Sequence, residues 1–185
     1  MPILSAEPAI FPDNLMEAGP TDWGERRWWV LHTKSRQEKC LARQLHEKSV
    51  PFFLPLVPRR LKIRGKIRQS YLPLFGGYVF LLVDGEEYVA ALSTRRVACA
   101  LEVPDQKRLW SELTQIYRLI ATGAPINAEE RLVPGAPVEI QSGPLAGLRG
   151  VIVRSASGSK FIVKVDFIER GASVWIDDFA LTIAS

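Results

Sequence analysis

The sequence predicts a two-part α+β protein, in which an N-terminal α/β sandwich precedes a small C-terminal β-barrel of the SH3-like kind. Three observations lead to this prediction. Aromatic and β-branched runs alternate with helical patterns through residues 26–122. Residues 123–133 lack apolar periodicity and are expected to form a linker. Residues 134–185 change to a period of two, with glycine-rich turns and no helical pattern, which is typical of a small barrel.

The composition is that of a globular protein without a membrane segment. Of the 185 residues 47% are apolar and 24% are charged, and no apolar run approaches the ~18–20 residues that a membrane helix needs. No signal-peptide pattern opens the chain, and the two cysteines, Cys40 and Cys99, imply no disulfide framework. We therefore expect a cytoplasmic, monomeric protein.

Nothing in the sequence has the spacing of a catalytic or metal site. His32 and His46 do not lie near cysteines at metal-ligand spacing, and no phosphate-binding glycine loop precedes a helix. The pair Asp177-Asp178 is more typical of a strand end than of acid–base catalysis. We expect no enzymatic activity, no cofactor and no metal.

Charge is distributed unevenly along the chain. Residues 1–25 carry five acids and no Lys or Arg, residues 26–125 carry 18 Lys or Arg against 8 Asp or Glu, and residues 126–185 are nearly neutral. The acidic first segment has no sustained period and is expected to be a disordered tail. The positive middle segment is expected to face phosphate or an acidic protein surface, although a solvated cationic face is the simpler alternative.

The elements of the first domain follow from local patterns taken in chain order. A strand is expected at residues 28–32, and Ser35-Arg36-Gln37-Glu38 has the spacing of a capping box that would open a helix ending before Pro51. Two strands, at residues 52–57 and 71–83, flank a polar arm. A short helix, a strand and a final helix follow, at residues 86–92, 97–103 and from Asp105 to Gly123.

The arm between the two strands, residues 58–70, is strongly basic. It holds six cations within ten residues and no acid: Arg59, Arg60, Lys62, Arg64, Lys66 and Arg68. Because the even-numbered positions from 60 to 68 are all cationic, an extended strand would carry them on one side. Such a row could contact a nucleic-acid duplex or a single strand, and a solvated hairpin that resists aggregation is the alternative.

A glycine-rich stretch carries the most specific pattern in the chain. In GAPVEIQSGPLAGLRGVIV, residues 135–153, Gly143, Gly147 and Gly150 separate two strands at places where the chain must reverse tightly. The stretch resembles the KOW motif: an opening glycine, alternating strand residues, then G-P-L-x-G-x-x-G and a β-branched strand. A generic SH3-like barrel with glycine turns is the alternative reading. The resemblance implies a KOW barrel that docks on protein or RNA.

A second resemblance lies upstream of the linker. The segment WWVLHT from Trp28, the helix, the basic hairpin and the segment PLFGGYVF from Pro73 resemble the N-terminal domain of the NusG family. Together the two resemblances cover about residues 27–185, and the order of N-terminal domain, linker and KOW barrel is typical of that family. The resemblance implies a transcription elongation or antitermination factor. The short helix, which has few family-typical residues, and the acidic N-terminal segment resemble a specialised paralogue of the RfaH-like or polysaccharide-operon type.

The NusG resemblance implies a contact with the clamp of the largest RNA polymerase subunit. The matching positions are His32, Tyr78, Phe80 and Leu101. Tyr78 and Phe80 have the same parity on one strand and would point to one face, while Val79 would point to the other. One face can be core and the other an interface, so an ordinary core role for these residues stays open.

The resemblance implies further partners. In RfaH-like relatives the positive side contacts the displaced non-template DNA strand, which assigns Lys34, Arg36, Lys39 and Arg95 to DNA beside the arm. The stretch Glu87-Tyr88-Val89-Ala90 departs from the hydroxyl-rich run by which relatives contact a second polymerase element. The KOW barrel would recruit a small-subunit ribosomal protein or the termination factor Rho. The alternative function is a KOW-bearing, ribosome-associated RNA-binding protein without a polymerase contact.

Overall fold

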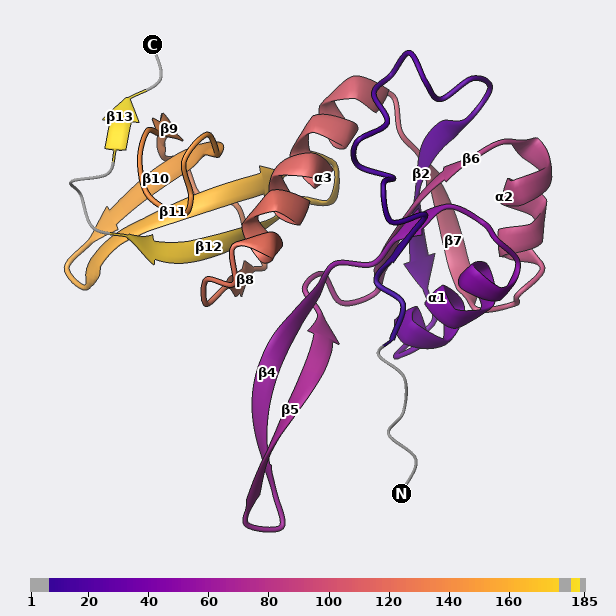
Figure 1. Cartoon of the computed structure of the whole chain (residues 1–185), viewed down its shortest axis with the longest axis horizontal. Helices are drawn as coiled ribbons and strands as arrows, with labels where there is room; N and C mark the ends of the chain where they lie inside the picture. The colour runs from indigo at the N-terminus through magenta and orange to yellow at the C-terminus, as the bar shows by residue number, and fades with distance from the viewer. Residues whose placement is uncertain (1–6, 177–180, 184–185) are drawn as a thin grey trace. The chain divides into compact units, whose positions relative to one another are not determined.

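The computed structural model describes residues 7–176 and the strand at residues 181–183. The chain forms two compact units, residues 1–107 and 108–185, which are described separately below. The boundary lies earlier than the predicted linker, because the last helix is grouped with the second unit from Arg108 onward. The predicted mixture of helices and sheets is confirmed (Figure 1).

The first unit is built on a five-stranded antiparallel sheet. Strand β6 (Tyr78–Val83) lies at its centre between β3 (Phe52–Phe53) and β2 (Arg27–Thr33). Strand β1 (Ile10–Phe11) lies at one edge and β7 (Val97–Glu102) lies at the other. Five of the six residues of β6 are buried, as the nearly continuous apolar run predicts for a strand covered on both faces.

One face of this sheet forms the core with the helices. Odd-numbered sheet residues pack with helix α1 (Glu38–Glu47) and with Ala91 of α2 (Gly85–Leu92). The helix contributes Leu41, Ala42 and Leu45, which recur at helical spacing. The sheet contributes Leu31, Val79, Leu81 and Val83. The even-numbered residues of β2 and β6 are therefore left for the opposite face.

The predicted capping box at Ser35 is wrong. Helix α1 begins after Gln37, which makes no side-chain cap, and the Glu38 carboxylate instead accepts a hydrogen bond from Gly77 N at 2.7 Å. The Glu38 carboxylate therefore accepts from Gly77, which is distant in the sequence, and not from the backbone N–H of Ser35 as a capping box requires. A complete capping box occurs at α2, where Asp84 accepts from Glu87 N at 2.9 Å and Glu87 accepts from Asp84 N at 3.0 Å.

The prediction of a disordered N-terminal tail is wrong for residues 7–25, while residues 1–6 lie outside the described part of the chain. Strand β1 pairs with β3, and Leu15 and Met16 are buried. Trp23 is 8% exposed, meets Trp28 edge-on at 6.3 Å, and donates from Nε1 to Ala18 O at 3.2 Å. Burial of these few large apolar side chains stabilises a segment whose short elements give no periodic pattern.

The basic arm is a two-stranded antiparallel ribbon that extends away from the sheet of the first unit (Figure 1). Strands β4 (Leu56–Ile63) and β5 (Lys66–Pro73) are joined by Arg64 and Gly65. Both turn residues have positive φ, 49° and 76°, as a type I′ hairpin turn requires. The arm predicted as a polar excursion is therefore itself made of two strands, and each strand predicted to flank it is divided: residues 52–57 into β3 and the start of β4, and residues 71–83 into the end of β5 and β6.

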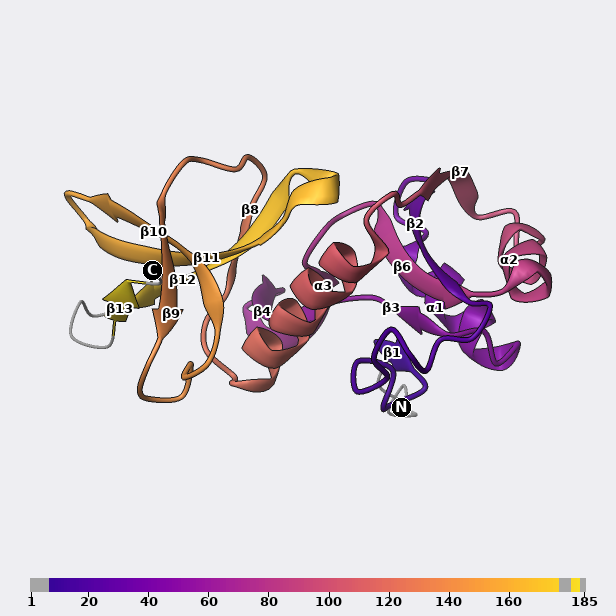
Figure 2. The ribbon, with the colours of Figure 1, turned by 90° about the horizontal axis from the view of Figure 1, so that it is seen from above.

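The second unit contains helix α3 (Gln106–Ala121) and a six-stranded antiparallel sheet, seen from another side in Figure 2. The helix buries Leu109, Leu113, Ile116 and Leu119 on one stripe, and Gly123 after it has φ +72°, as predicted for a residue that closes a helix. The strand order is β13 (Leu181–Ile183), β9 (Ala136–Ile140), β10 (Arg149–Ser155), β11 (Gly158–Val165), β12 (Arg170–Ile176) and β8 (Asn127–Glu129).

Part of the predicted linker is ordered as a strand. Residues 127–129 form β8, which pairs with β12. Between β11 and β12 a short 3-10 helix covers Asp166–Ile168. Phe161, Val163, Val165 and Val174 form the buried interior of the sheet, as the period-two pattern predicts. From residue 161 to 176 the chain is in strands, apart from that short helix and the turn at Glu169, and Asp177 and Asp178 lie outside the described residues.

Two of the three predicted turn glycines are confirmed, and the third has another role. Gly143 and Gly147 have φ of +84° and +82°. Gly150 lies inside β10, where a Cβ atom would stand 2.3 Å from Ile162 O and 2.8 Å from Phe161 Cε2. Glycine is needed there for close packing of neighbouring strands. In the described part of the chain, no helix is both long and apolar enough to span a membrane.

Candidate functional site

The four residues predicted to contact a polymerase lie on one face of the first unit's sheet. His32 is directly opposite Tyr78 on one side and opposite a cysteine of β7 on the other. In the next row Val30 is opposite Phe80 and Leu101. Directly paired residues of an antiparallel ladder point to the same face. We call these two rows on β6, β2 and β7 the even face, after the even-numbered residues of β2 and β6 that form it.

The first row of the even face is accessible, and the second is partly covered. His32 is exposed, Tyr78 and Leu101 are half-buried, and the His32 and Tyr78 rings lie 5.3 Å apart at an angle of 56°. Phe80 is fully buried, with the Phe75 ring edge-on at 6.3 Å. Phe80 therefore supports the face from beneath in this structure and does not present its ring at the surface.

Tyr78 is positioned by the turn that precedes it. Gly77 O accepts a hydrogen bond from Thr33 N at 2.8 Å, and Gly77 N donates to Glu38 Oε1 at 2.7 Å. Gly77 has φ +84°, and a Cβ atom there would lie 3.3 Å from His32 Nε2. A glycine at this position thus allows the turn and leaves room for the imidazole ring.

Sequence reasoning missed one member of the first row. Cys99 is exposed and lies opposite His32 on β7. It precedes Leu101 by two residues, so the alternation along a strand could have placed it on the same face. The register of β7 shifts between His32 and Thr33, which ends the even rows at this point.

Two basic loops meet at the end of the sheet next to His32. The loop after β2 carries Lys34 and Arg36, and the loop after α2 carries Arg95 and Arg96. Lys34 N donates to Arg96 O at 2.9 Å, which brings the two loops together. Lys39 lies in the first turn of α1 and is half-buried. Lys34, Arg36 and Arg95 are thus grouped next to His32, and Lys39 lies on the helix that follows the first loop.

Within this group the side chains differ in their availability. Lys34, Arg36 and Arg95 are exposed, whereas the Arg96 guanidinium donates to Gln37 Oε1 and its Nε is buried. Arg36 and Arg95 have φ of 57° and 59°, a conformation that L-residues adopt at a cost. Arg96 connects the two loops through its backbone carbonyl, which accepts from Lys34 N, and through its guanidinium, which donates to Gln37.

The predicted single row of cations along the arm is wrong. The turn at Arg64-Gly65 reverses the chain, so even-numbered residues before and after it do not share a face. Lys62 is paired with Ile67 and Arg60 with Gln69, whereas Arg68 is paired with Leu61 and Lys66 with Ile63. Arg60 and Lys62 therefore lie on one face, and Lys66 and Arg68 lie on the other, with Arg59.

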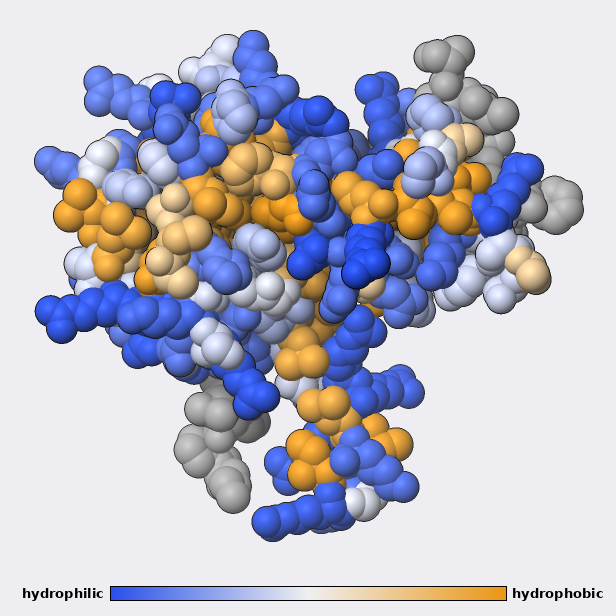
Figure 3. Space-filling view, turned by 180° about the vertical axis from the view of Figure 1, so that it is seen from behind, coloured by the Kyte–Doolittle hydropathy of each residue, from blue (hydrophilic) through white to orange (hydrophobic). Residues whose placement is uncertain are grey.

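The arm is exposed and mixes apolar with cationic side chains (Figure 3). The apolar residues exposed on it are Leu61, Ile63, Ile67, Tyr71 and Leu72. Within the described part of the chain, none of the arm's cations forms an ion pair with a carboxylate. Their charge is therefore available to an external anion.

The short helix α2 uses its polar residues internally. Glu87 closes the capping box and accepts two hydrogen bonds from the Arg26 guanidinium, at 2.6 and 2.9 Å. The Tyr88 ring lies 4.5 Å from the Trp29 ring. Val89 remains exposed. This helix thus offers an apolar side chain where the hydroxyl-rich run of relatives would be expected.

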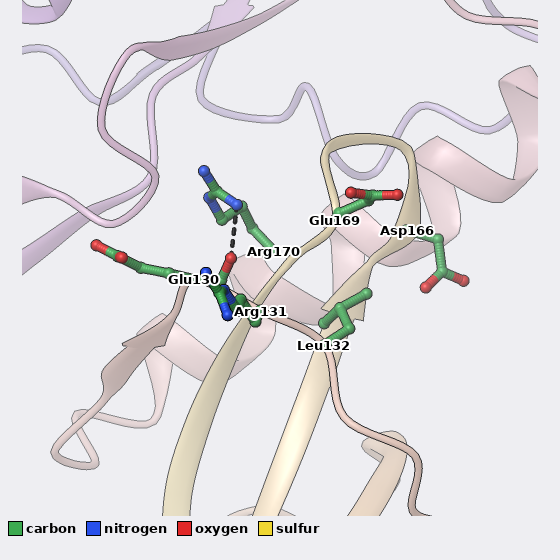
Figure 4. A pocket seen from close by; sticks show the side chains of 6 residues that line it. All are labelled: Glu130, Arg131, Leu132, Asp166, Glu169 and Arg170. Carbon is green, nitrogen blue, oxygen red and sulfur yellow. Dashed lines mark hydrogen bonds between the residues drawn. The ribbon is translucent and has the colours of Figure 1, made fainter.

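The second unit has an exposed aromatic residue and a polar hollow. Trp175 of β12 is 51% exposed, and Lys160 Nζ lies 5.1 Å from its ring centre. The hollow, of about 690 Å³, is lined by charged side chains from two segments and by one leucine (Figure 4): Glu130, Arg131, Leu132, Asp166, Glu169 and Arg170. Arg170 donates there to Glu130 O at 2.6 Å. Three acidic side chains and two arginines line it, so charges of both signs face the hollow.

A carboxylate on α3 has an unusual proton affinity. Burial raises the pKa of Glu112 to about 7, and the nearby Asp166 carboxylate adds to the rise. Hydrogen bonds from Asp166 N at 3.1 Å and from Arg108 Nε at 3.2 Å act in the opposite direction. Arg108 also pairs with the Asp166 carboxylate. Within the described residues, no three His, Cys, Asp or Glu side chains are grouped so as to hold a metal ion.

Comparison with known proteins identifies the family. The family described as "Transcription termination factor nusG" matches residues 26–131, more than half of the chain. No curated protein matches the chain. A solved structure described as "Domain interaction in Thermotoga maritima NusG" is similar at 22% sequence identity and a TM-score of 0.46, and the match covers 88% of this chain and 99% of that one. By its sequence match, this chain belongs to the NusG family of transcription factors.

Proposed function

We propose that this chain regulates transcription elongation by binding the clamp of the largest RNA polymerase subunit through the even face. NusG-family membership gives the role in transcription elongation and termination. The observation that carries the finer proposal is the register that brings His32, Tyr78 and Leu101 onto one face of three adjacent strands. A surface of aromatic and aliphatic side chains next to a histidine suits an apolar partner with a few polar groups.

The basic loops beside the even face extend the proposal to nucleic acid. Lys34 follows His32 by two residues, so a polymerase seated on the even face would have Lys34, Arg36 and Arg95 at its margin. Charge–charge attraction to phosphate would then draw the displaced non-template strand onto the loops. Lys39 would contribute from the first turn of α1.

The second unit, which we propose to be a KOW barrel, would recruit a second partner while the first unit stays on the polymerase. A small-subunit ribosomal protein or Rho are the proposed partners. The exposed Trp175 supports a protein contact there, since tryptophan is enriched among interface residues that dominate binding energy. The protein would act by binding in the cytoplasm, as a monomer, without catalysing a reaction.

The altered short helix supports a specialised, RfaH-like role within the family. Where relatives present hydroxyl groups, this chain presents Val89, with Glu87 and Tyr88 engaged in internal contacts. A factor that lacks the second polymerase contact would depend more on the even face and on nucleic acid.

Binding to purified RNA polymerase tests the proposal. Tyr78→Ala and Leu101→Ala should each weaken binding by about tenfold or more, as truncation of central interface residues does. Glu102→Ala is the matched control, because Glu102 is paired with Trp29 and faces the other side of the same strand. Equal binding by folded Tyr78→Ala, Leu101→Ala and Glu102→Ala variants would contradict the proposal. Recovery of ribosomal RNA without polymerase from a lysate would favour the ribosome-associated alternative.

A further inference from the structure

We propose that the β4–β5 arm enters a groove of double-stranded DNA, with each face of the ribbon directed toward one phosphate strand. This inference rests on the proposed function, since it names the nucleic acid that accompanies polymerase binding. It concerns a surface separate from the even face, so the two can fail independently.

The distribution of charge is the first argument. Arg60 and Lys62 lie on one face of the ribbon, and Lys66 and Arg68 lie on the other. A single nucleic-acid strand that lies along the ribbon would meet one face and leave the cations of the other unpaired. A groove is bounded by a phosphate strand on each side, so both faces of an inserted ribbon find anions. The two-sided distribution therefore favours a duplex.

The size of the ribbon is the second argument. At ~3.4 Å per residue, the six residues from Pro58 to Ile63 extend roughly 20 Å. The major groove of B-form DNA is about 12 Å wide and about 8.5 Å deep, and it admits a two-stranded ribbon. The major groove of an A-form RNA helix is deep and narrow, and side chains cannot read it. The dimensions thus favour DNA over duplex RNA.

The residues next to the turn are the third argument. Ile67 is 73% exposed and is paired with Lys62, and Ile63 is paired with Lys66, so each face ends in one isoleucine beside one lysine. Interfaces between proteins are depleted of lysine at their centres, which disfavours a protein partner for this tip. In a groove the lysines can reach phosphate while the isoleucines contact thymine methyl groups or base edges.

The conformation of the tip is the fourth argument. A two-residue turn with positive φ at Arg64 and Gly65 matches the right-handed twist of the flanking strands. The chain has to order little of this backbone on binding, because the ribbon is already paired from Leu56 to Pro73. The arm is therefore pre-formed for insertion.

The test measures how the affinity of the full chain for labelled nucleic acids depends on salt concentration. The probes are a 20-base-pair DNA duplex, one of its strands alone, and an RNA duplex of the same sequence. Two matched double variants remove two charges from one face each: Arg60→Gln with Lys62→Gln, and Lys66→Gln with Arg68→Gln. The control, Lys48→Gln with Lys107→Gln, removes two exposed charges elsewhere.

On the DNA duplex, each double variant should lower the log–log salt slope by about 1.8, since each phosphate contact contributes about 0.9. The control should leave the slope unchanged. Ile67→Ser should weaken duplex binding severalfold without changing the slope, because it removes no charge.

Three results would overturn the inference: an effect from only one of the two faces, an arm-variant effect on single-strand or RNA-duplex binding as large as that on DNA-duplex binding, or no nucleic-acid binding at all. Binding of the arm variants to polymerase without nucleic acid should equal that of the unaltered chain. Loss of that binding would bear on the proposed function, and not on the groove.

Discussion

Replacement of Gly150 by alanine should strongly destabilise the second unit's sheet. The new Cβ atom would stand 2.3 Å from Ile162 O and 2.8 Å from the Phe161 ring, both inside the 3.0 Å that real Cβ atoms essentially never cross. Phe161 is fully buried and Ile162 O belongs to a central strand, so neither can move without disturbing the sheet. We expect a cost of about 3 kcal/mol or more.

That cost is large for a unit of this size. At ~0.05–0.15 kcal/mol per residue, the second unit, residues 108–185, has roughly 4–12 kcal/mol of stability. Gly143→Ala is the matched control: nothing lies within 4 Å of its Cβ position, and only its φ of +84° is strained. It should cost about 1 kcal/mol.

Amide hydrogen exchange of the full chain measures the stability of each unit separately in one experiment. In Gly150→Ala the amides of β10, β11 and β12 should lose most of their protection, while those of β6 keep theirs. In Gly143→Ala protection in β10 to β12 should fall only slightly. Equal protection of Gly150→Ala and the unaltered chain would refute the close-packing role of this glycine.

The remaining predictions concern three other contacts. Trp23→Ala should lower the free energy of unfolding of the first unit by about 3 kcal/mol, since it removes a buried ring that packs on Trp28. Urea denaturation measures this change, and an unchanged midpoint would mean that Trp23 contributes nothing to the stability of the first unit. Glu38→Ala should cost about 1 kcal/mol by leaving Gly77 N without its acceptor, and Glu38→Gln, which keeps an acceptor oxygen, should cost less. Because the pKa of Glu112 is raised to about 7 in the folded protein, the second unit should lose about 1 kcal/mol of stability, allowing for solvent screening, as the pH rises from 5 to 8. Glu112→Gln should remove that slope in exchange-protection measurements, and an identical slope in both proteins would contradict the assignment.

The even face shows what alternation along a strand can predict. The shared parity of Tyr78 and Phe80 placed both on one face, and the structure confirms it. The alternation does not predict how deeply each residue of a face is buried, however. Phe80 is covered by Phe75, and only a tertiary arrangement decides which residues of a face stay accessible.

The arm shows a different limit of sequence patterns. An even spacing of cations predicts one row only if the strand is continuous, and the turn at Arg64-Gly65 interrupts it. Arginine is an unusual first residue of such a turn, so Gly65 alone is a weak sequence indication of a hairpin turn here.

The helix ends and the N-terminus depended on long-range contacts. Ser35 and Asp84 both begin the residue pattern of a capping box, but at Ser35 the acid three residues on binds Gly77 instead. Trp23 and Leu15 become ordered by burial against residues elsewhere in the chain, which no local period records. Gly143 and Gly147, by contrast, are predictable from their spacing alone because both serve local turns.

Site-specific photo-crosslinking tests the central claim, that the even face contacts RNA polymerase. A photo-reactive amino acid is placed at the position of Leu101 in one variant and at that of Glu102 in another, and each full chain is irradiated with purified polymerase. The two positions are neighbours on β7 and face opposite sides of the sheet. If the even face binds the polymerase, a crosslink to the largest subunit should form from position 101 and little from position 102. Equal crosslinking from both positions, or crosslinking from 102 alone, would contradict it.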